Sequence, residues 1–252
     1  MVKRKKGIIT LLVAAVATML YIYLNAPIAV GEWTKQTLYL WTLNCCHIQS
    51  KDAIPRILLI DDDSGEGVFF IKQLCDELHI KATFAVIPSM MNQETKDSLR
   101  SWQKQGFDIA LHGYNHGNWR EWTYQDIVND ISRSEKWLAD SGFMPLKSKF
   151  VVAPRGSNTQ DIRKAIKDKG YQMITGANII NPDTQVFLLG RIFISPDTDL
   201  IAMREILIKA YERKAFVILG THSSIPGSFS VEKTREVIKI AKEIGFCFDI
   251  ND

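Results

Sequence analysis

The chain has 252 residues, of which 46% are hydrophobic, enough to bury one sizeable core as a single α/β domain. Its net charge is +3, but four cations lie within residues 1–6, so the other residues together carry +3 − 4 = −1. This balance argues against the basic surface that nucleic-acid binding requires, and we expect no nucleic-acid partner.

An uncharged apolar stretch, residues 7–24, follows these cations. It is about as long as a helix that crosses a bilayer, and two tyrosines lie at its far end, where aromatic rings favour the membrane interface. Basic residues before the stretch predict a cytoplasmic tail of residues 1–6 and an extracytoplasmic domain at the cell membrane. A cleaved signal peptide is the alternative. Cleavage would place Leu24 or Pro27 where a small residue is preferred, so we favour an uncleaved anchor.

Residues 25–54 are predicted to form a membrane-proximal linker, and the organised domain is expected to span residues 55–252. Apolar side chains in the linker could form a short amphipathic helix or pack on the domain. The four cysteines of the chain have neither the density of a disulfide scaffold nor the paired spacing of a cysteine zinc site. We expect them to be packing thiols.

From residue 55 onward, apolar runs typical of strands alternate with helical patterns. The predicted strands cover residues 56–60, 83–87, 108–111, 150–152, 172–175, 186–189, 216–219 and 246–250. The predicted helices cover residues 68–78, 94–105, 124–139, 200–213 and 231–244. Repeated β–α units imply a parallel sheet, and about seven of them predict an α/β barrel or an open sheet.

Residues that can bind a metal or catalyse hydrolysis come directly after four of the predicted strands. They are Asp61-Asp62-Asp63, His112 with His116, Pro154-Arg155, and His222. The carboxyl ends of parallel strands form one face of such folds, where active sites lie, so we expect these residues to converge. Two imidazoles and a carboxylate can hold a divalent ion and leave coordination positions open. The sequence therefore predicts a metal-dependent hydrolase.

The order and spacing of these residues resemble the polysaccharide deacetylase domain (NodB-homology domain, carbohydrate esterase family 4) over about residues 55 to 250. The family's Thr-Phe-Asp-Asp-Gly motif is matched loosely by residues 59–63, its His-x-x-x-His motif by residues 112–116, and its Leu-x-x-His motif by residues 219–222. Its Arg-x-Pro-aromatic-Gly motif is partly present at residues 152–156. The resemblance implies a distorted (β/α) barrel with fewer than eight strands.

Carried over residue by residue, the resemblance implies a role for each polar residue. The metal ligands would be Asp62, His112 and His116, the general base Asp61, and the general acid His222. Zn²⁺ is the most favoured ion, although these ligands also accept other first-row divalent ions. A shift of the alignment by one residue, to Asp62 and Asp63, is the alternative for the two carboxylates, and the third aspartate would otherwise cap a helix.

The third and fourth family motifs are incomplete. The family arginine that orients the base corresponds to Val152, the family aromatic corresponds to Arg155, and the Asp-x-x-Asp-Trp motif survives at best as Asp199. We hypothesise that Arg155 or Arg191 supplies the missing cation near Asp61, with a plain surface charge as the alternative. The backbone N–H of Arg155 is expected, by resemblance, to stabilise the oxyanion.

Three residues are predicted to contact the substrate. They are Pro154, Trp119 and Trp122, of which the two tryptophans could stack on a sugar ring or pack in the core. The predicted activity is removal of acetyl groups from N-acetylated sugars of an envelope polysaccharide. The alternatives are a catalytically weak or inactive glycan-binding relative, which the incomplete motifs favour, and a related hydrolase of another amide or ester.

Overall fold

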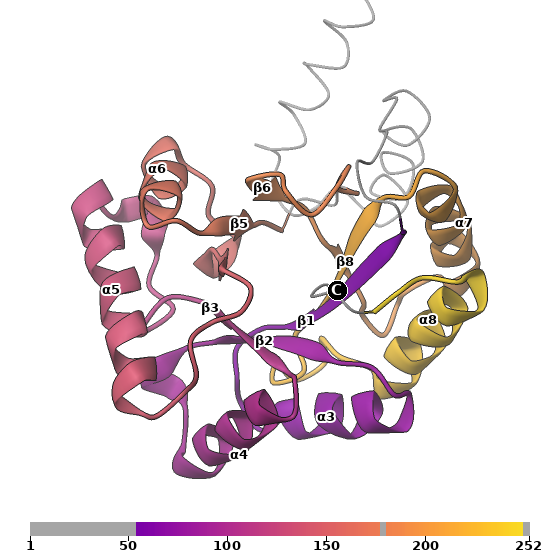
Figure 1. The fold of residues 1–252 in the computed structure, drawn as a ribbon, viewed down its shortest axis with the longest axis horizontal. Helices are drawn as coiled ribbons and strands as arrows, with labels where there is room; N and C mark the ends of the chain where they lie inside the picture. The colour runs from indigo at the N-terminus through magenta and orange to yellow at the C-terminus, as the bar shows by residue number, and fades with distance from the viewer. Residues whose placement is uncertain (1–53, 177–179, 249–252) are drawn as a thin grey trace, which may run out of the picture. The chain divides into compact units, whose positions relative to one another are not determined.

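Eight parallel strands form the centre of the structure, a computed structural model that describes residues 54–176 and 180–248. In chain order the strands are β1 (Arg56–Asp61), β2 (Ala82–Val86), β3 (Asp108–Leu111), β4 (Phe150–Val152), β5 (Gln172–Ile174), β6 (Leu188–Leu189), β7 (Ile192–Phe193) and β8 (Phe216–Thr221). The α-helices are α3 (Val68–Glu77), α4 (Gln93–Lys104), α5 (Tyr124–Asp140), α6 (Gln160–Asp168), α7 (Leu200–Glu212) and α8 (Val231–Ile244). The helices lie outside the strands, along the left, lower and right sides in Figure 1.

The predicted α/β class is confirmed, with three local differences. Helix α6 was not predicted, although Thr159 caps it by accepting a hydrogen bond from the N–H of Ile162 and its apolar residues have helical spacing. Strand β7 was not predicted because it is only two residues long. The strand predicted at 246–250 is, in the described part of the chain, only a single bridge between Arg56 and Cys247.

The predicted tail, anchor and nearly all of the predicted linker lie outside the described residues. Within residues 54–176 and 180–248, no helix is long and apolar enough to cross a membrane. The membrane anchor at residues 7–24 therefore stays a prediction.

The two edges of the sheet meet. The strand order is β6-β5-β4-β3-β2-β1-β8-β7, so β6 and β7 lie at opposite edges, yet only Gly190 and Arg191 separate them in sequence. Three Cα–Cα steps reach about 11 Å at most, so the sheet must curl until its edges are close. The segment pairs with β5 through Leu189 and then with β8 through Ile192. Counted as one strand, β6 and β7 reduce eight strands to seven, consistent with the predicted distorted barrel.

Asn181 holds the two edges of the sheet together. Its backbone exchanges both hydrogen bonds with Phe216 of β8. Its buried side chain donates to the carbonyl of Gly190 (2.9 Å) and accepts from the Gly190 N–H (2.8 Å). Asn181 thus satisfies both backbone groups of Gly190, in the segment that closes the barrel.

Alternation along the strands divides the apolar residues into two cores. Ile57 and Leu59 of β1 belong to the cluster under the helices, whereas Leu58 and Ile60 belong to the cluster inside the barrel. The inner cluster also contains Val152 at the end of β4. At the end of a strand, therefore, one side chain points outward beneath the helices and the next points into the barrel mouth.

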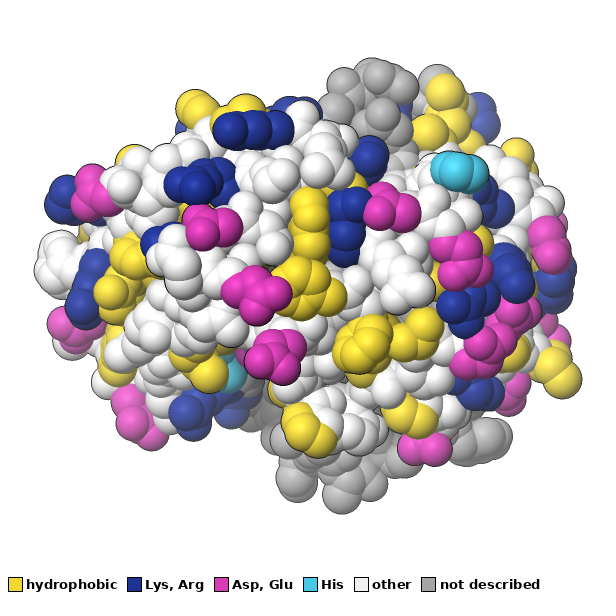
Figure 2. Space-filling view, turned by 90° about the horizontal axis from the view of Figure 1, so that it is seen from below, with side chains coloured by type: hydrophobic (Ala, Val, Ile, Leu, Met, Phe, Trp, Pro, Cys, Tyr) yellow, Lys and Arg dark blue, Asp and Glu magenta, His cyan; other side chains and the backbone are white. Residues whose placement is uncertain are grey.

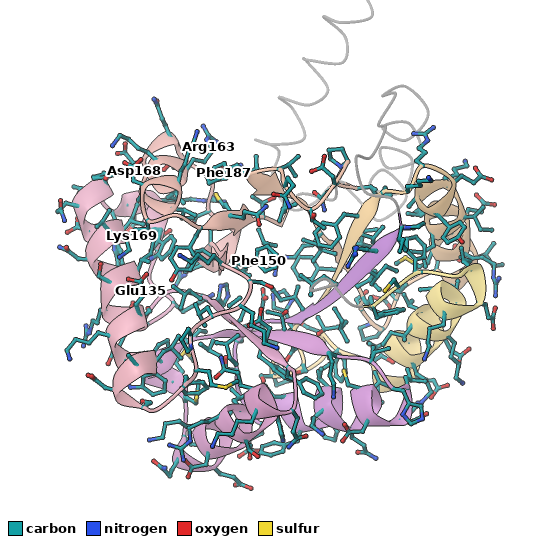
Figure 3. All side chains as sticks on the ribbon, viewed as in Figure 1. Glu135, Phe150, Arg163, Asp168, Lys169 and Phe187 are labelled. Carbon is teal, nitrogen blue, oxygen red and sulfur yellow. The ribbon has the colours of Figure 1, made fainter. Side chains whose placement is uncertain are left out.

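Polar contacts hold the outer layer. Glu135 of α5 accepts hydrogen bonds from Lys169 Nζ (2.6 Å) and Tyr171 Oη (2.8 Å), which ties α5 to the turn between α6 and β5 (Figure 3). On the face shown in Figure 2, Lys and Arg side chains are interspersed with Asp and Glu, and hydrophobic side chains lie between them in small groups.

We expect Asn181→Ala to destabilise the fold by about 2 to 4 kcal/mol, because it leaves the buried N–H and C=O of Gly190 without partners. The free energy of unfolding in urea measures this loss. Asn129→Ala is the matched control, since that exposed side chain bonds to Gln125 alone among the described residues, and its loss should change stability by less than about 0.5 kcal/mol. Equal effects of the two substitutions would contradict a role for Asn181 in closing the barrel.

Candidate metal and hydrolytic site

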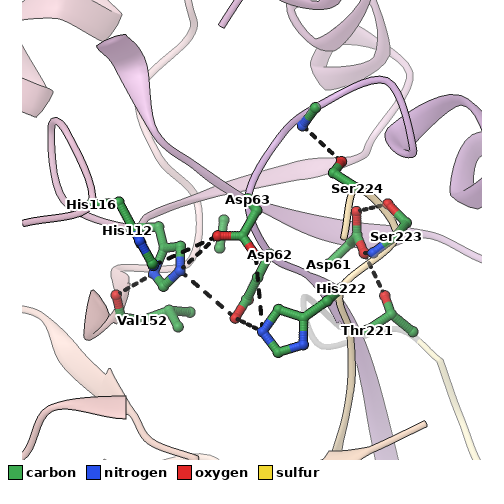
Figure 4. Close-up of polar contacts among 12 residues, drawn as sticks. Asp61, Asp62, Asp63, His112, His116, Val152, Thr221, His222, Ser223 and Ser224 are labelled. Atoms are coloured by element: carbon green, nitrogen blue, oxygen red, sulfur yellow. Dashed lines mark hydrogen bonds and ion pairs between the residues drawn. The ribbon is translucent and has the colours of Figure 1, made fainter. Parts of the chain in front are cut away.

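The loops after β1, β3 and β8 bring the predicted polar residues together at the carboxyl ends of the strands, beside the end of β4 (Figure 4). The cluster consists of Asp61, Asp62, Asp63, His112, His116, Val152, Thr221, His222, Ser223 and Ser224. The convergence expected for a parallel barrel is therefore observed. The partners of each aspartate differ from those predicted.

Asp63, His112 and His116 form a group that could hold a metal ion. Each offers one ligand atom, and these atoms lie within 4.8 Å of one another. Asp63 Oδ1 is 3.5 Å from His112 Nε2 and 3.7 Å from His116 Nε2. Asp62, which the resemblance implied as the ligand, lies 3.9 Å from His112 Nε2 and is not part of the group. The geometry favours the alternative alignment, shifted by one residue.

The ring of His112 is oriented for metal binding. Its Nδ1 lies 2.8 Å from the carbonyl oxygen of Val152, so this nitrogen carries the proton and Nε2 is left to face Asp63. Burial lowers the pKa of His112, but the Asp62 carboxylate and a hydrogen bond to Asp63 outweigh it and raise the pKa overall. The imidazole would therefore release its proton when an ion binds.

Several residues of the site have a backbone conformation that side chains other than glycine rarely adopt. Positive φ angles occur at Asp63 (73°), Ser64 (40°), His116 (54°) and Arg155 (57°), and at only two other non-glycine positions in the described residues. Such strain persists only where the surroundings enforce it, and it concentrates at functional sites. Here it turns Asp63 and His116 toward the same point.

Asp62 forms a buried ion pair with Arg191. Arg191 Nη1 is 2.7 Å from Asp62 Oδ1, and both side chains are almost completely buried. Burial would raise the pKa of Asp62, but Arg191 and then His112 hold it well below its usual range, so the carboxylate stays ionised. Its other oxygen, Oδ2, is 3.4 Å from His222 Nε2. The cation that we expected near Asp61 is therefore the guanidinium of Arg191, which contacts Asp62 instead.

Phe193 packs between Arg191 and His222. The Arg191 guanidinium lies 4.4 Å from the centre of the Phe193 ring, and the His222 ring stacks on Phe193 at 4.6 Å with an interplanar angle of 10°. Gly220 leaves room for this stack, because a Cβ there would lie 3.1 Å from atoms of both Arg191 and Phe193. Phe193 was not predicted from the sequence. The strand-like alternation around it could have indicated that residues 191 and 193 lie on the same side of the segment.

Asp61, the predicted base, faces another way. Its carboxylate accepts hydrogen bonds from Thr221 Oγ1 (2.6 Å), the Ser223 N–H (2.9 Å) and Ser223 Oγ (2.5 Å). Burial raises its pKa to about 7, although these hydrogen bonds oppose the rise. Asp61 is outside the metal-binding group, and it does not cap α3, whose N-cap is Gly67.

The other predicted residues differ in their surroundings. Arg155 is exposed beside the site, and its charge helps to lower the pKa of His116, after burial and the charge of His112. Pro154 is buried and packs close to Gly113. Asp199 caps α7 by accepting from the N–H groups of Ile201 and Ala202, so it serves the helix.

The two tryptophans do not behave alike. Trp119 is 0% exposed and belongs to the core beneath the helices, so the prediction that it stacks on a sugar ring is wrong. It begins the 3-10 turn, Trp119–Glu121, that precedes α5. Trp122 is partly buried, packs against that core and closely approaches Gly117.

Comparisons with known proteins relate this fold and site to others. A family model described as polysaccharide deacetylase matches residues 51–174, a range that ends before Arg191 and His222. An uncharacterized protein of Methanocaldococcus jannaschii is 28% identical over 142 residues, which are 50% of this chain and 56% of that protein. The chain thus matches little more than half the length of this relative.

Two solved structures share the fold. The chitin deacetylase of the fungal pathogen Colletotrichum lindemuthianum is 16% identical, with a TM-score of 0.57 over 78% of this chain and 86% of that one. A CE4 family pseudoenzyme from Bacillus anthracis is 15% identical, with a TM-score of 0.52 over 77% of this chain and 63% of that one. At these identities the likeness concerns the fold alone.

We expect Asp63→Ala and His116→Ala to weaken metal binding by at least about 100-fold, because each removes one ligand atom of the group. Asp61→Asn should bind metal as the unchanged protein does. The bound zinc of each variant, measured by elemental analysis after dialysis against Zn²⁺, checks this. Loss of metal from Asp61→Asn together with its retention in Asp63→Ala would contradict the assignment.

Proposed function

We propose, from the premise that this chain belongs to the polysaccharide deacetylase family, that it is a metal-dependent hydrolase that removes acetyl groups from N-acetylated sugars of an envelope polysaccharide. One observation carries the proposal. The possible metal ligands Asp63, His112 and His116 lie beside an ionised carboxylate, Asp62, and an imidazole, His222. Hydrolysis of an acetamide needs these groups in one place.

The proposed cofactor is a divalent ion, with Zn²⁺ preferred, held by Asp63, His112 and His116. One carboxylate and two imidazoles suit first-row divalent ions, and the hydrogen bond of His112 Nδ1 to the Val152 carbonyl directs Nε2 toward Asp63. When bound, such an ion polarises a substrate carbonyl and lowers the pKa of a water molecule.

In the proposed reaction, Asp62 and His222 handle the protons. Asp62 Oδ2 is the oxygen of this carboxylate that does not contact Arg191, and it lies 3.4 Å from His222 Nε2, so we assign to it the proton of the attacking water. The water oxygen bonds to the carbonyl carbon, the C–N bond breaks, and the products are acetate and an amine. His222 donates a proton to the departing nitrogen, because an unprotonated amide nitrogen is a poor leaving group.

Arg191 supports an active enzyme over an inactive relative. The family's motif arginine is replaced by Val152, a loss that favours an inactive protein, and the pseudoenzyme from Bacillus anthracis shows that the fold also occurs without activity. Yet Arg191, in the connection between β6 and β7, provides a buried guanidinium 2.7 Å from Asp62 Oδ1. A cation beside the proposed base is therefore present, and we favour activity.

The proposed location is the outer side of the cell membrane, with residues 7–24 as a single-pass anchor. The support is the uncharged stretch preceded by the basic tail. An envelope polysaccharide would be within reach of a domain tethered in this way.

We expect the protein to release acetate from oligomers of N-acetylglucosamine, and chelation of metal by dipicolinate to reduce the rate by at least about 100-fold. Added Zn²⁺ should restore it. Acetylated xylan is the comparison substrate, because it carries esters in place of amides. Release from xylan alone would identify an esterase, and no release from either substrate by metal-loaded protein would favour the inactive relative.

Arg191→Lys should lower the turnover of the N-acetylated substrate by about 10-fold or more, because an ammonium group lacks the planar geometry that holds Asp62. Arg155→Lys is the matched control: it keeps the charge and the backbone N–H of an exposed side chain and should change turnover by less than about 3-fold. Turnover is compared at equal folded fraction, checked by circular dichroism. Unchanged turnover in Arg191→Lys would contradict compensation by Arg191.

A further inference from the structure

We propose that Asp61 is a positioning residue, which holds the loop that carries His222 against the loop that carries Asp62 and Asp63. This inference rests on the proposed function, in which His222 protonates the leaving amine. It assigns Asp61 neither the role of base nor that of metal ligand.

The contacts of Asp61 go to both neighbours of His222. Thr221 Oγ1 donates to Asp61 Oδ1 at 2.6 Å, and the Ser223 N–H donates to the same oxygen at 2.9 Å. Ser223 Oγ donates to Asp61 Oδ2 at 2.5 Å. The carboxylate is 0% exposed, so water does not compete for it. Both carboxylate oxygens thus accept hydrogen bonds from the residues directly before and after His222.

Further contacts join the same two loops. The N–H of Asp62 donates to the carbonyl of Thr221 (3.0 Å), and the N–H of Gly65 donates to Ser224 Oγ (2.8 Å). Gly67 allows this close approach, because a Cβ there would lie 2.2 Å from the backbone of Ser223. Several hydrogen bonds therefore hold the loop after β8 against the loop after β1, and those of Asp61 are accepted by a buried carboxylate.

The direction of Asp61 excludes a direct part in the chemistry. Alternation at the end of β1 turns Asp62 toward the barrel mouth, where it meets Arg191 and His222. Asp61 turns outward, toward Thr221 and Ser223. The ring of His222 is then held by Phe193 and Asp62, and its backbone by Asp61. A displacement of about 1 Å in a proton donor can lower a rate by about 100-fold, so this fastening matters for catalysis.

Substrates with different leaving groups test this role. An amide needs protonation of its nitrogen, whereas 4-nitrophenyl acetate has a leaving group that departs as an anion. We expect Asp61→Asn to lower turnover of an N-acetylglucosamine oligomer by about 10-fold or more, and of 4-nitrophenyl acetate by less than about 3-fold. Bound zinc should be unchanged. The double variant Thr221→Val with Ser223→Ala, which removes the two hydroxyl donors and keeps the carboxylate, should show the same selective loss.

Asp108→Asn is the matched control. Like Asp61, Asp108 is a buried carboxylate. It accepts hydrogen bonds from the backbone N–H groups of Ile109 and Ser148, and it lies at the opposite end of the barrel. It should change turnover of both substrates by the same factor. An equal loss on both substrates in Asp61→Asn would indicate a base or a general effect on folding, loss of zinc would indicate a ligand, and either result would overturn the inference.

A readout independent of activity separates this inference from the proposed function. The ¹³C and ¹H shifts of the His222 ring, assigned by comparison with His222→Asn, should move in Asp61→Asn and in the double variant but not in Asp108→Asn. If the unchanged protein hydrolyses neither substrate, the proposed function fails and these shifts still decide the role of Asp61. Unmoved His222 shifts in Asp61→Asn would overturn it.

Discussion

The buried ion pair between Asp62 and Arg191 joins the first strand of the barrel to the segment that closes it. Arg191 follows β6 and precedes β7, so the residue that completes the sheet also supplies the cation of the site. Removing one partner of such a pair leaves an uncompensated buried charge, at a cost of about 3 to 5 kcal/mol. This contact therefore contributes both to barrel closure and to the electrostatics of the site.

Three consecutive aspartates make three different sets of contacts. Asp61 lies on the outward side of β1 and bonds to Thr221 and Ser223, and Asp62 points into the barrel mouth. Asp63 has a positive φ, which breaks the strand alternation and turns its carboxylate toward two histidines. Neighbouring carboxylates of one chemical type can in this way be separated into different functions by backbone geometry alone.

The parallel barrel also explains how an incomplete family motif can be compensated. The family's third motif lies after β4, where this chain has Val152, whose carbonyl still orients His112. All carboxyl ends meet at one mouth, so the guanidinium of Arg191, which precedes β7, reaches Asp62 although it is distant in sequence from β4. A motif search along the sequence cannot find such a replacement, because Arg191 is distant in sequence from the third motif and lies just before a strand of only two residues.

The sequence by itself determined the α/β class, most strand and helix positions, and the set of polar residues at the mouth, because hydrophobic periodicity and strand ends are local properties. It also raised Arg191 and the one-residue shift as alternatives, without deciding either. Only the tertiary structure assigned partners: Asp63 to the histidines, Asp62 to Arg191, and Trp119 to the core. These depend on side-chain direction at a strand end and on contacts between distant segments, and neither is contained in local sequence patterns.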